Sequence, residues 1–151
     1  MPTEFSYARV LDGIWSGGTY VCWGTDNREA PVRLCGLSTA GSPNRPHFEI
    51  KTVDGTSNPY LAFAALLGAG SLGVRQGALL TSGDCSRISA ASMSEEERKD
   101  IGLEDTARIP ESITDARAKL KEDSQLIELL GETFAEAYFS VNEVRNFPIW
   151  L

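Results

Sequence analysis

The sequence lacks the residue patterns that mark several large classes of proteins. It has one histidine, His47, and its three cysteines, Cys22, Cys35 and Cys85, do not have the spacing of a metal site. An odd number of cysteines without such spacing favours reduced thiols. No stretch approaches the roughly 20 apolar residues of a membrane span, and the N-terminus shows no apolar signal segment. These absences predict a cytoplasmic protein that does not bind membranes.

Positive charge is also scarce. The chain has 14 Lys and Arg residues against 21 Asp and Glu residues, which gives a formal net charge of -7. Nucleic acids and anionic lipids repel such a chain, so we expect neither as a partner. A length of 151 residues suffices for one domain with a modest core. With no internal repeats in view, we expect a single domain over residues 1–151.

Residues 68–73, GAGSLG, match the G-x-G-x-x-G pattern of dinucleotide-binding loops. That pattern works only where it follows a strand and opens a helix. Here Asn58 and Pro59 are start signals for a helix that precedes the glycines. Apolar residues on all sides of the segment 60–67 predict that this helix is buried. Close packing and a C-cap therefore explain the glycines better than phosphate binding does, because the C-terminal end of a helix repels anions.

The remaining pattern predicts an α+β fold. We expect a short antiparallel sheet with one buried helix packed on it and a C-terminal helical group. The predicted helices start near residue 4, at Asn58, at Ser94 and at Ser112, and further helices follow Ser112. The predicted strands cover residues 19–23, 31–36 and 46–54. The segment 19–23 is expected to form an open edge of the sheet.

Alternation along the second and third strands separates apolar from charged side chains. The apolar set, which points to one face, consists of Val32, Leu34, Phe48 and Ile50. The polar set, which points to the opposite face, consists of Arg33, His47, Glu49 and Lys51. If the strands pair antiparallel, the apolar face packs against helix 58–72, and the opposite face gathers cations around Glu49. Arg28 joins them from the loop that precedes the second strand.

Two interpretations of this charged cluster stay open on spacing alone. It is either a solvated sheet face, whose ion pairs contribute about 0–1 kcal/mol each, or an anion site. In an anion site, the planar forks of Arg28 and Arg33 would hold a phosphate or a carboxylate. His47 has no second histidine beside it in the sequence to support a role as a metal ligand.

Three stretches of the chain resemble the catalytic domain of the glutamine synthetase family. They are NREAPVRL at 27–34, FEIKTVDGTSNPYLAFAALLGAGSLGV at 48–74, and the helical tail at 109–147. The variants in this chain are most similar to the glutamine-synthetase-like portion of FluG-type proteins. The resemblance implies the C-terminal half of that catalytic domain. It also implies an ATP- and Mg²⁺-dependent ligase that joins glutamate to ammonia or an amine through an acyl phosphate.

The resemblance also implies roles for individual residues. Arg28 and Arg33 match arginines that contact ATP phosphates, and they and Lys51 are the expected catalytic residues. Glu49 matches a metal-ligand glutamate. Lys51 and His47 occupy substrate-binding positions where the family usually has arginines. Because a lysine is a point charge and not a planar fork, the recognition of the substrate carboxylate is expected to differ.

Other departures from the family concern the second substrate and the completeness of the site. Ser16 falls near the place of a family glutamate that helps to bind ammonium, which leaves the amine open. Most metal ligands of the family, and its N-terminal β-grasp domain, come before the segment seen here. We therefore expect a truncated chain that is inactive alone and that forms a homo-oligomer or needs a missing partner segment. The alternative is a non-catalytic binding or regulatory protein derived from the same fold.

Overall fold

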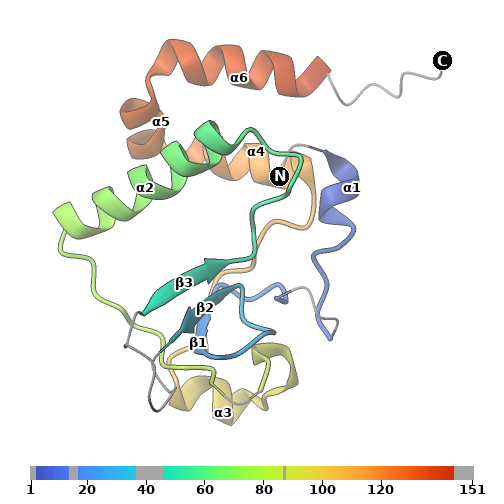
Figure 1. The fold of residues 1–151 in the computed structure, drawn as a ribbon, viewed down its shortest axis with the longest axis vertical. Coiled ribbons are helices and arrows are strands. Elements are labelled where there is room, and N and C mark those ends of the chain that lie inside the picture. Colours follow the sequence, from blue (N-terminus) through green and yellow to red (C-terminus); the bar gives the residue numbers. More distant parts are fainter. Residues whose placement is uncertain (1–2, 14–16, 37–45, 87, 145–151) are drawn as a thin grey trace. The chain divides into compact units, whose positions relative to one another are not determined.

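The computed structural model describes residues 3–13, 17–36, 46–86 and 88–144, which form two compact units (Figure 1). We call Met1–Ala8, Val53–Leu79 and Pro110–Leu151 the helical unit, and Arg9–Thr52 and Leu80–Ile109 the sheet unit. Helices together with a three-stranded sheet confirm the α+β class. No described helix is long and apolar enough to span a membrane. The prediction of a single domain stays a prediction.

The helices of the helical unit begin where the sequence signals place them. They are α1 (Glu4–Tyr7), α2 (Pro59–Arg75), α4 (Ile113–Glu122), α5 (Ser124–Leu130) and α6 (Glu132–Val144). The side chain of Asn58 accepts a hydrogen bond from the Tyr60 amide at 3.0 Å, and that of Ser112 accepts one from the Asp115 amide at 3.0 Å. Each bond satisfies an amide that the helix itself leaves without a partner. Helix α5 contacts α2, α4 and α6 and so holds the unit together.

The glycines of the GAGSLG motif lie inside α2 and not at its end. The helix continues to Arg75, its C-cap is Gln76, and the left-handed residue that follows is Gly77 at φ 63°. The C-cap interpretation of the motif is therefore wrong. Close packing is correct for Gly68, because a Cβ there would lie 2.8 Å from Leu129 of α5, whereas a Cβ at Gly70 would meet open space. No described strand precedes α2 in the manner that a dinucleotide-binding loop requires.

Within the helical unit α2 is mostly exposed, contrary to the expectation of a buried helix. Gly68 is its one buried residue, while Tyr60 and Val74 are both 84% exposed and Phe63 and Leu67 are exposed as well. The reason is that short α5 covers only part of a helix that is apolar on all sides. Because α2 and the sheet belong to different units, the packing of α2 on the sheet stays a prediction.

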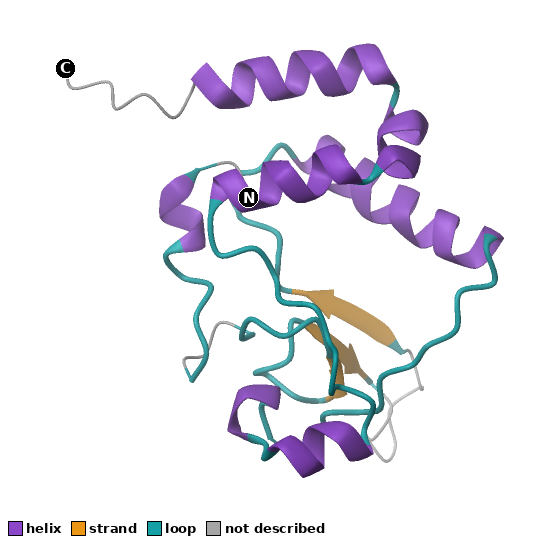
Figure 2. Cartoon of the chain, turned by 180° about the vertical axis from the view of Figure 1, so that it is seen from behind, coloured by secondary structure: helices purple, strands orange, loops and turns teal. Residues whose placement is uncertain are grey.

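The sheet consists of β1 (Trp23–Thr25), β2 (Val32–Cys35) and β3 (His47–Ile50), in that order, and all three strands are seen in Figure 2. The pairing of β2 with β3 is antiparallel, as predicted. Strand β1, however, pairs with β2 in parallel, so the sheet is mixed. After β1 the chain turns back at Asp26, whose φ of 53° lies in the left-handed region that aspartate tolerates.

The segment 19–23 is not an open edge, contrary to expectation. The Val21 amide donates to the Ala107 carbonyl at 3.0 Å, the Ile109 amide donates to Thr19 at 2.7 Å, and the Cys85 amide donates to Trp23 at 3.0 Å. Two segments from late in the chain thus cover its backbone groups. Among the described strands, β3 forms the exposed edge, and all four of its residues are exposed.

A small core and one short helix complete the sheet unit. The core contains the buried residues Cys22, Ala30, Cys85, Ala90 and Leu103. Helix α3 (Glu95–Asp100) has the predicted Ser94 cap, in which Ser94 and Glu97 form a reciprocal capping box. The single-turn helix η1 (Ala90–Ser92) precedes it and contributes Ala90 to the core.

Asp12 links the start of the sheet unit to its end through hydrogen bonds. Its carboxylate accepts hydrogen bonds from the Thr19 amide at 2.8 Å and from Arg108 at 3.0 Å, and the Arg108 guanidinium lies 3.5 Å from the centre of the Tyr20 ring. Partial burial alone would raise the pKa of Asp12. The hydrogen bonds from Thr19 and the charge of Arg108 outweigh it, so the pKa falls below its ordinary 3.8.

Asp12→Asn is expected to destabilise the sheet unit at neutral pH by about 1 kcal/mol, because it removes charge-assisted hydrogen bonds. A lowered carboxyl pKa gives stability that is present above the unfolded value and is lost as the pH falls through the folded value. The difference between wild type and variant should therefore shrink below about pH 4. Thermal unfolding between pH 7 and pH 3 measures it, with Asp105→Asn at an exposed position as the control. A difference that is constant with pH would contradict the assignment.

Candidate functional site

Arg33 is the centre of the candidate site. It lies on β2 directly opposite Glu49 of β3, and its Nη1 lies 3.3 Å from Glu49 Oε2. Its Nη2 lies 3.7 Å from Asp26 Oδ1, at the end of β1. The Glu49 and Asp26 side chains are 48% and 41% exposed, so each ion pair alone contributes about 0–1 kcal/mol. The guanidinium of Arg33 thus lies between two half-exposed carboxylates.

The third nitrogen of the guanidinium has no partner. Arg33 Nε is buried and is the one buried side-chain nitrogen or oxygen, among the described residues, that lacks a hydrogen bond. A buried donor without an acceptor costs about 1–3 kcal/mol. An anionic oxygen at this position would remove that cost. This orphaned donor is the feature that separates the site from an ordinary charged sheet face.

Two further cations lie around Arg33. Lys51 follows β3, its amide donates to the Pro31 carbonyl at 2.9 Å, and its Nζ donates to the carbonyl oxygen of Arg28. Burial lowers the pKa of Lys51, the charges of Arg33 and Arg28 lower it further, and Glu49 opposes them. The structure therefore brings together Arg33, Glu49 and Lys51, as the alternation of side chains predicted, and Arg28 on the preceding loop meets Lys51 through its backbone carbonyl.

Other predicted residues are less central. His47 pairs with Cys35 at the end of the β2–β3 ladder, two residues from Glu49 on the same face and exposed. Ser16 lies outside the described residues. The sequence reasoning missed Asp26, which is the second carboxylate on Arg33. Its signal was an Asp-Asn pair directly after a strand, where aspartate often adopts a left-handed turn.

The described residues do not by themselves fit a metal ion. No group of three or more His, Cys, Asp and Glu side chains among them could hold one. Magnesium takes about six oxygen ligands in octahedral geometry. Glu49 offers one carboxylate, which is already paired with Arg33. At most, this part of the chain contributes a single ligand.

Comparison with known proteins gives a consistent result. A family model described as the catalytic domain of glutamine synthetase matches residues 1–147. The protein fluG of Emericella nidulans is 43% identical over 143 residues, which are 95% of this chain and 15% of that protein. Type-1 glutamine synthetase 1 of Dictyostelium discoideum is 33% identical, over 95% of this chain and 26% of the relative.

Two more similarities extend the range of related activities and structures. A γ-glutamylpolyamine synthetase of Streptomyces coelicolor is 32% identical, over 93% of this chain and 29% of its own length. A crystal structure of a glutamine synthase homologue superposes with a TM-score of 0.69 and 28% identity, over 94% of this chain and 29% of that one. The chain thus spans less than a third of each of these four relatives.

Proposed function

This chain belongs to the glutamine synthetase family, and from that premise we propose that it supplies the anion-binding strand pair of an ATP-dependent ligase. The reaction class is the joining of the γ-carboxylate of glutamate to ammonia or an amine through an acyl phosphate. The buried, unpartnered Nε of Arg33 carries the proposal. An acyl-phosphate reaction brings several anions together and needs fixed positive groups to hold them.

Each cation of the cluster has a proposed part. Arg28 and Arg33 bind and orient the phosphates of ATP, and the orphaned Arg33 Nε donates to one phosphate oxygen. Lys51 and His47 face the substrate carboxylate, with Lys51 as a point charge. Glu49 holds the guanidinium of Arg33 in line and is one prospective ligand of Mg²⁺. Because the described residues do not fit a metal by themselves, no step is assigned to one.

Under this proposal the chain contributes only part of the active site of the ligase. Since the chain spans less than a third of the named relatives, we propose that catalysis needs further segments or subunits. The exposed apolar side chains of α2 support association with such a segment or with a second copy. The three free cysteines fit a reducing compartment such as the cytoplasm.

Binding of Mg-ATP tests the proposal. We expect ATP with Mg²⁺ to raise the midpoint of thermal unfolding of the wild-type chain, and Arg33→Ala to remove that rise. At a ligand concentration of ten times Kd, the stabilisation is about 1.4 kcal/mol. Differential scanning calorimetry measures it. Arg75→Ala, which removes an exposed cation at the end of α2, is the matched control and should keep the protection.

The other candidate function is a non-catalytic binding or regulatory module, which the exposed face of α2 favours. It predicts no effect of nucleotide on unfolding, together with association into larger species in light scattering. An absence of protection by Mg-ATP in the wild-type chain would decide for this alternative. Protection that survives in Arg33→Ala would show that nucleotide binds elsewhere.

A further inference from the structure

Two cysteines that lie 63 positions apart in the sequence occupy one core cluster of the sheet unit. Cys22 directly precedes β1, and Cys85 lies on the segment that runs beside it. Both are buried free thiols of the same cluster. Their pKa values shift in opposite directions because the two side chains interact: that of Cys22 rises and that of Cys85 falls. Neither thiol touches the cluster around Arg33 in the interactions described above. We propose that Cys22 and Cys85 form a reversible disulfide, so that this core is a site of oxidative modification.

The backbone around the two thiols is held in register by hydrogen bonds between the two segments. Trp23 and Asp84 form a parallel bridge, the Cys85 amide donates to the Trp23 carbonyl at 3.0 Å, and Trp23 Nε1 donates to Ser82 at 3.1 Å. This register places Cys85 beside Gly24, which is two residues from Cys22 and therefore on the same side of the extended chain. A Cβ at Gly24 would lie 2.6 Å from the Cys85 carbonyl oxygen.

Gly24 therefore determines how closely the segment with Cys85 approaches β1. Only a residue without a side chain lets the segment with Cys85 approach β1 this closely. A disulfide requires a Cβ–Cβ separation of about 3.5–4.5 Å. The bond therefore forms only if the two Cβ atoms reach this separation within the core.

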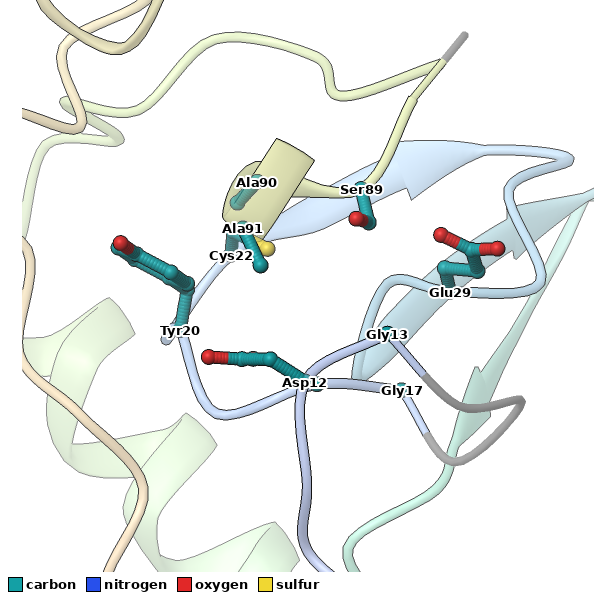
Figure 3. Close-up of a pocket in the computed structure, with 10 residues that line it drawn as sticks. Asp12, Gly13, Gly17, Tyr20, Cys22, Glu29, Ser89, Ala90 and Ala91 are labelled. Carbon is teal, nitrogen blue, oxygen red and sulfur yellow. The ribbon is translucent and has the colours of Figure 1, made fainter. Parts of the chain in front are cut away.

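A small hollow lies beside one of the two thiols. Cys22 borders a cavity of about 10 Å³ that is also lined by Asp12, Tyr20 and Ser89. Figure 3 shows the Cys22 sulfur beside Ala90 and Ala91 at this hollow. A cavity of this size has room for about one water molecule. Hydrogen peroxide, the small polar oxidant closest in size to water, is larger than one water molecule, so its entry requires the hollow to widen.

The chemistry balances with peroxide as the oxidant. One of the two sulfurs attacks a peroxide oxygen; an S–O bond forms, the O–O bond breaks, and the thiol proton leaves with the departing hydroxide as water. The other sulfur then attacks the sulfenic sulfur; an S–S bond forms, the S–O bond breaks, and the proton of this second thiol leaves in a second water. The two thiols lose two electrons and the peroxide gains them.

Hydrogen bonds connect the segment with Cys85 to the loop that follows β1, so the cross-link would affect that loop. The side chain of Asn27 is buried and donates to the Cys85 carbonyl and, at 3.1 Å, to the Ile88 carbonyl. Asp84 accepts from the Thr25 amide at 2.7 Å. A bond between Cys22 and Cys85 thus restrains residues 24–30. A consequence for anion binding by Arg28, which follows Asn27, rests on the proposed function, whereas the cross-link itself does not.

Oxidation of the native chain tests the proposal. The wild-type chain is treated with hydrogen peroxide, its remaining thiols are alkylated under denaturing conditions, and unreduced peptides are mapped by mass spectrometry. We expect one alkylated cysteine in place of three, a peptide in which Cys22 is linked to Cys85, and return of all three thiols after dithiothreitol. Hydrogen exchange of residues 24–30 should be slower in the oxidised chain and should recover on reduction.

Cys35→Ser is the matched control, because it removes the third buried cysteine and should still lose two thiols to the same bond. Cys22→Ser and Cys85→Ser should form no intramolecular bond. Three outcomes overturn the proposal: a link that includes Cys35, sulfinic acid at one cysteine without a link, or three free thiols after a treatment that oxidises the unfolded chain. Unchanged exchange of residues 24–30 in a cross-linked chain would refute the restraint on that loop.

Discussion

Gly102→Ala is expected to destabilise the chain by about 3 kcal/mol and to lower the midpoint of thermal unfolding by about 6–12 °C. Gly102 has a φ of 70°, in the left-handed region that costs a residue with a side chain about 1–3 kcal/mol. A Cβ there would also overlap the backbone carbonyl oxygen of Thr81, and overpacking against backbone costs about 1–3 kcal/mol more. Circular dichroism during heating measures the loss.

Gly70→Ala is the matched control, since it adds the same methyl group in open space inside α2. Alanine is the better helix former by about 0.5–1 kcal/mol, so this variant should be slightly more stable than wild type. Equal melting curves for Gly102→Ala and wild type would show that the turn after α3 does not have the described backbone.

Local signals in the sequence were sufficient to predict where three helices begin and how two of the strands pair. The caps at Asn58, Ser94 and Ser112 depend on residues within one helical turn, and the structure confirms all three. The antiparallel pairing of β2 with β3 was also predictable, because alternation fixes which residues share a face. It put Arg33 and Glu49 on one face of the sheet, and the register of the strands pairs them directly.

Contacts between distant segments were not predictable in the same way. The parallel pairing of β1 depends on a left-handed Asp26 and on residues near 84 and 107 that cover the segment 19–23. No pattern inside that segment reveals such partners. The same limit applies to α2, whose apolar composition predicts burial but does not say how much of it the chain itself covers.

Some features of the candidate site were likewise predictable from local sequence patterns, and others were not. The charges of Arg33, Glu49 and Lys51 follow from periodicity along two strands. The second carboxylate, Asp26, and the orphaned Nε of Arg33 arise from a turn geometry and a degree of burial that periodicity does not encode. The orphaned donor is the feature that favours an anion site over a solvated face, so the stronger evidence came from the structure.

The purified 151-residue chain is expected to show no ligase activity, that is, no release of phosphate that depends on both ATP and glutamate. The physical reason is that the described residues supply cations for binding anions but no set of ligands for a metal ion. Three cations, Arg28, Arg33 and Lys51, can bind anions, but the described residues include no cluster that could hold a metal. A phosphoryl transfer without its divalent ion loses the group that neutralises the developing charge. A colorimetric phosphate assay at several Mg²⁺ concentrations measures the release, with an active glutamine synthetase as the positive control.

Glu49→Gln distinguishes a true activity from a contaminant. The variant keeps the size of the side chain while removing the one carboxylate that faces Arg33 from β3. Phosphate release that Glu49→Gln abolishes and Glu132→Gln, an exposed position on α6, leaves intact would refute the expected inactivity. It would place a working metal site within this chain. Release that both variants retain would belong to another protein in the preparation. A chain that binds Mg-ATP through Arg33 yet releases no phosphate is the combination that an incomplete ligase site predicts.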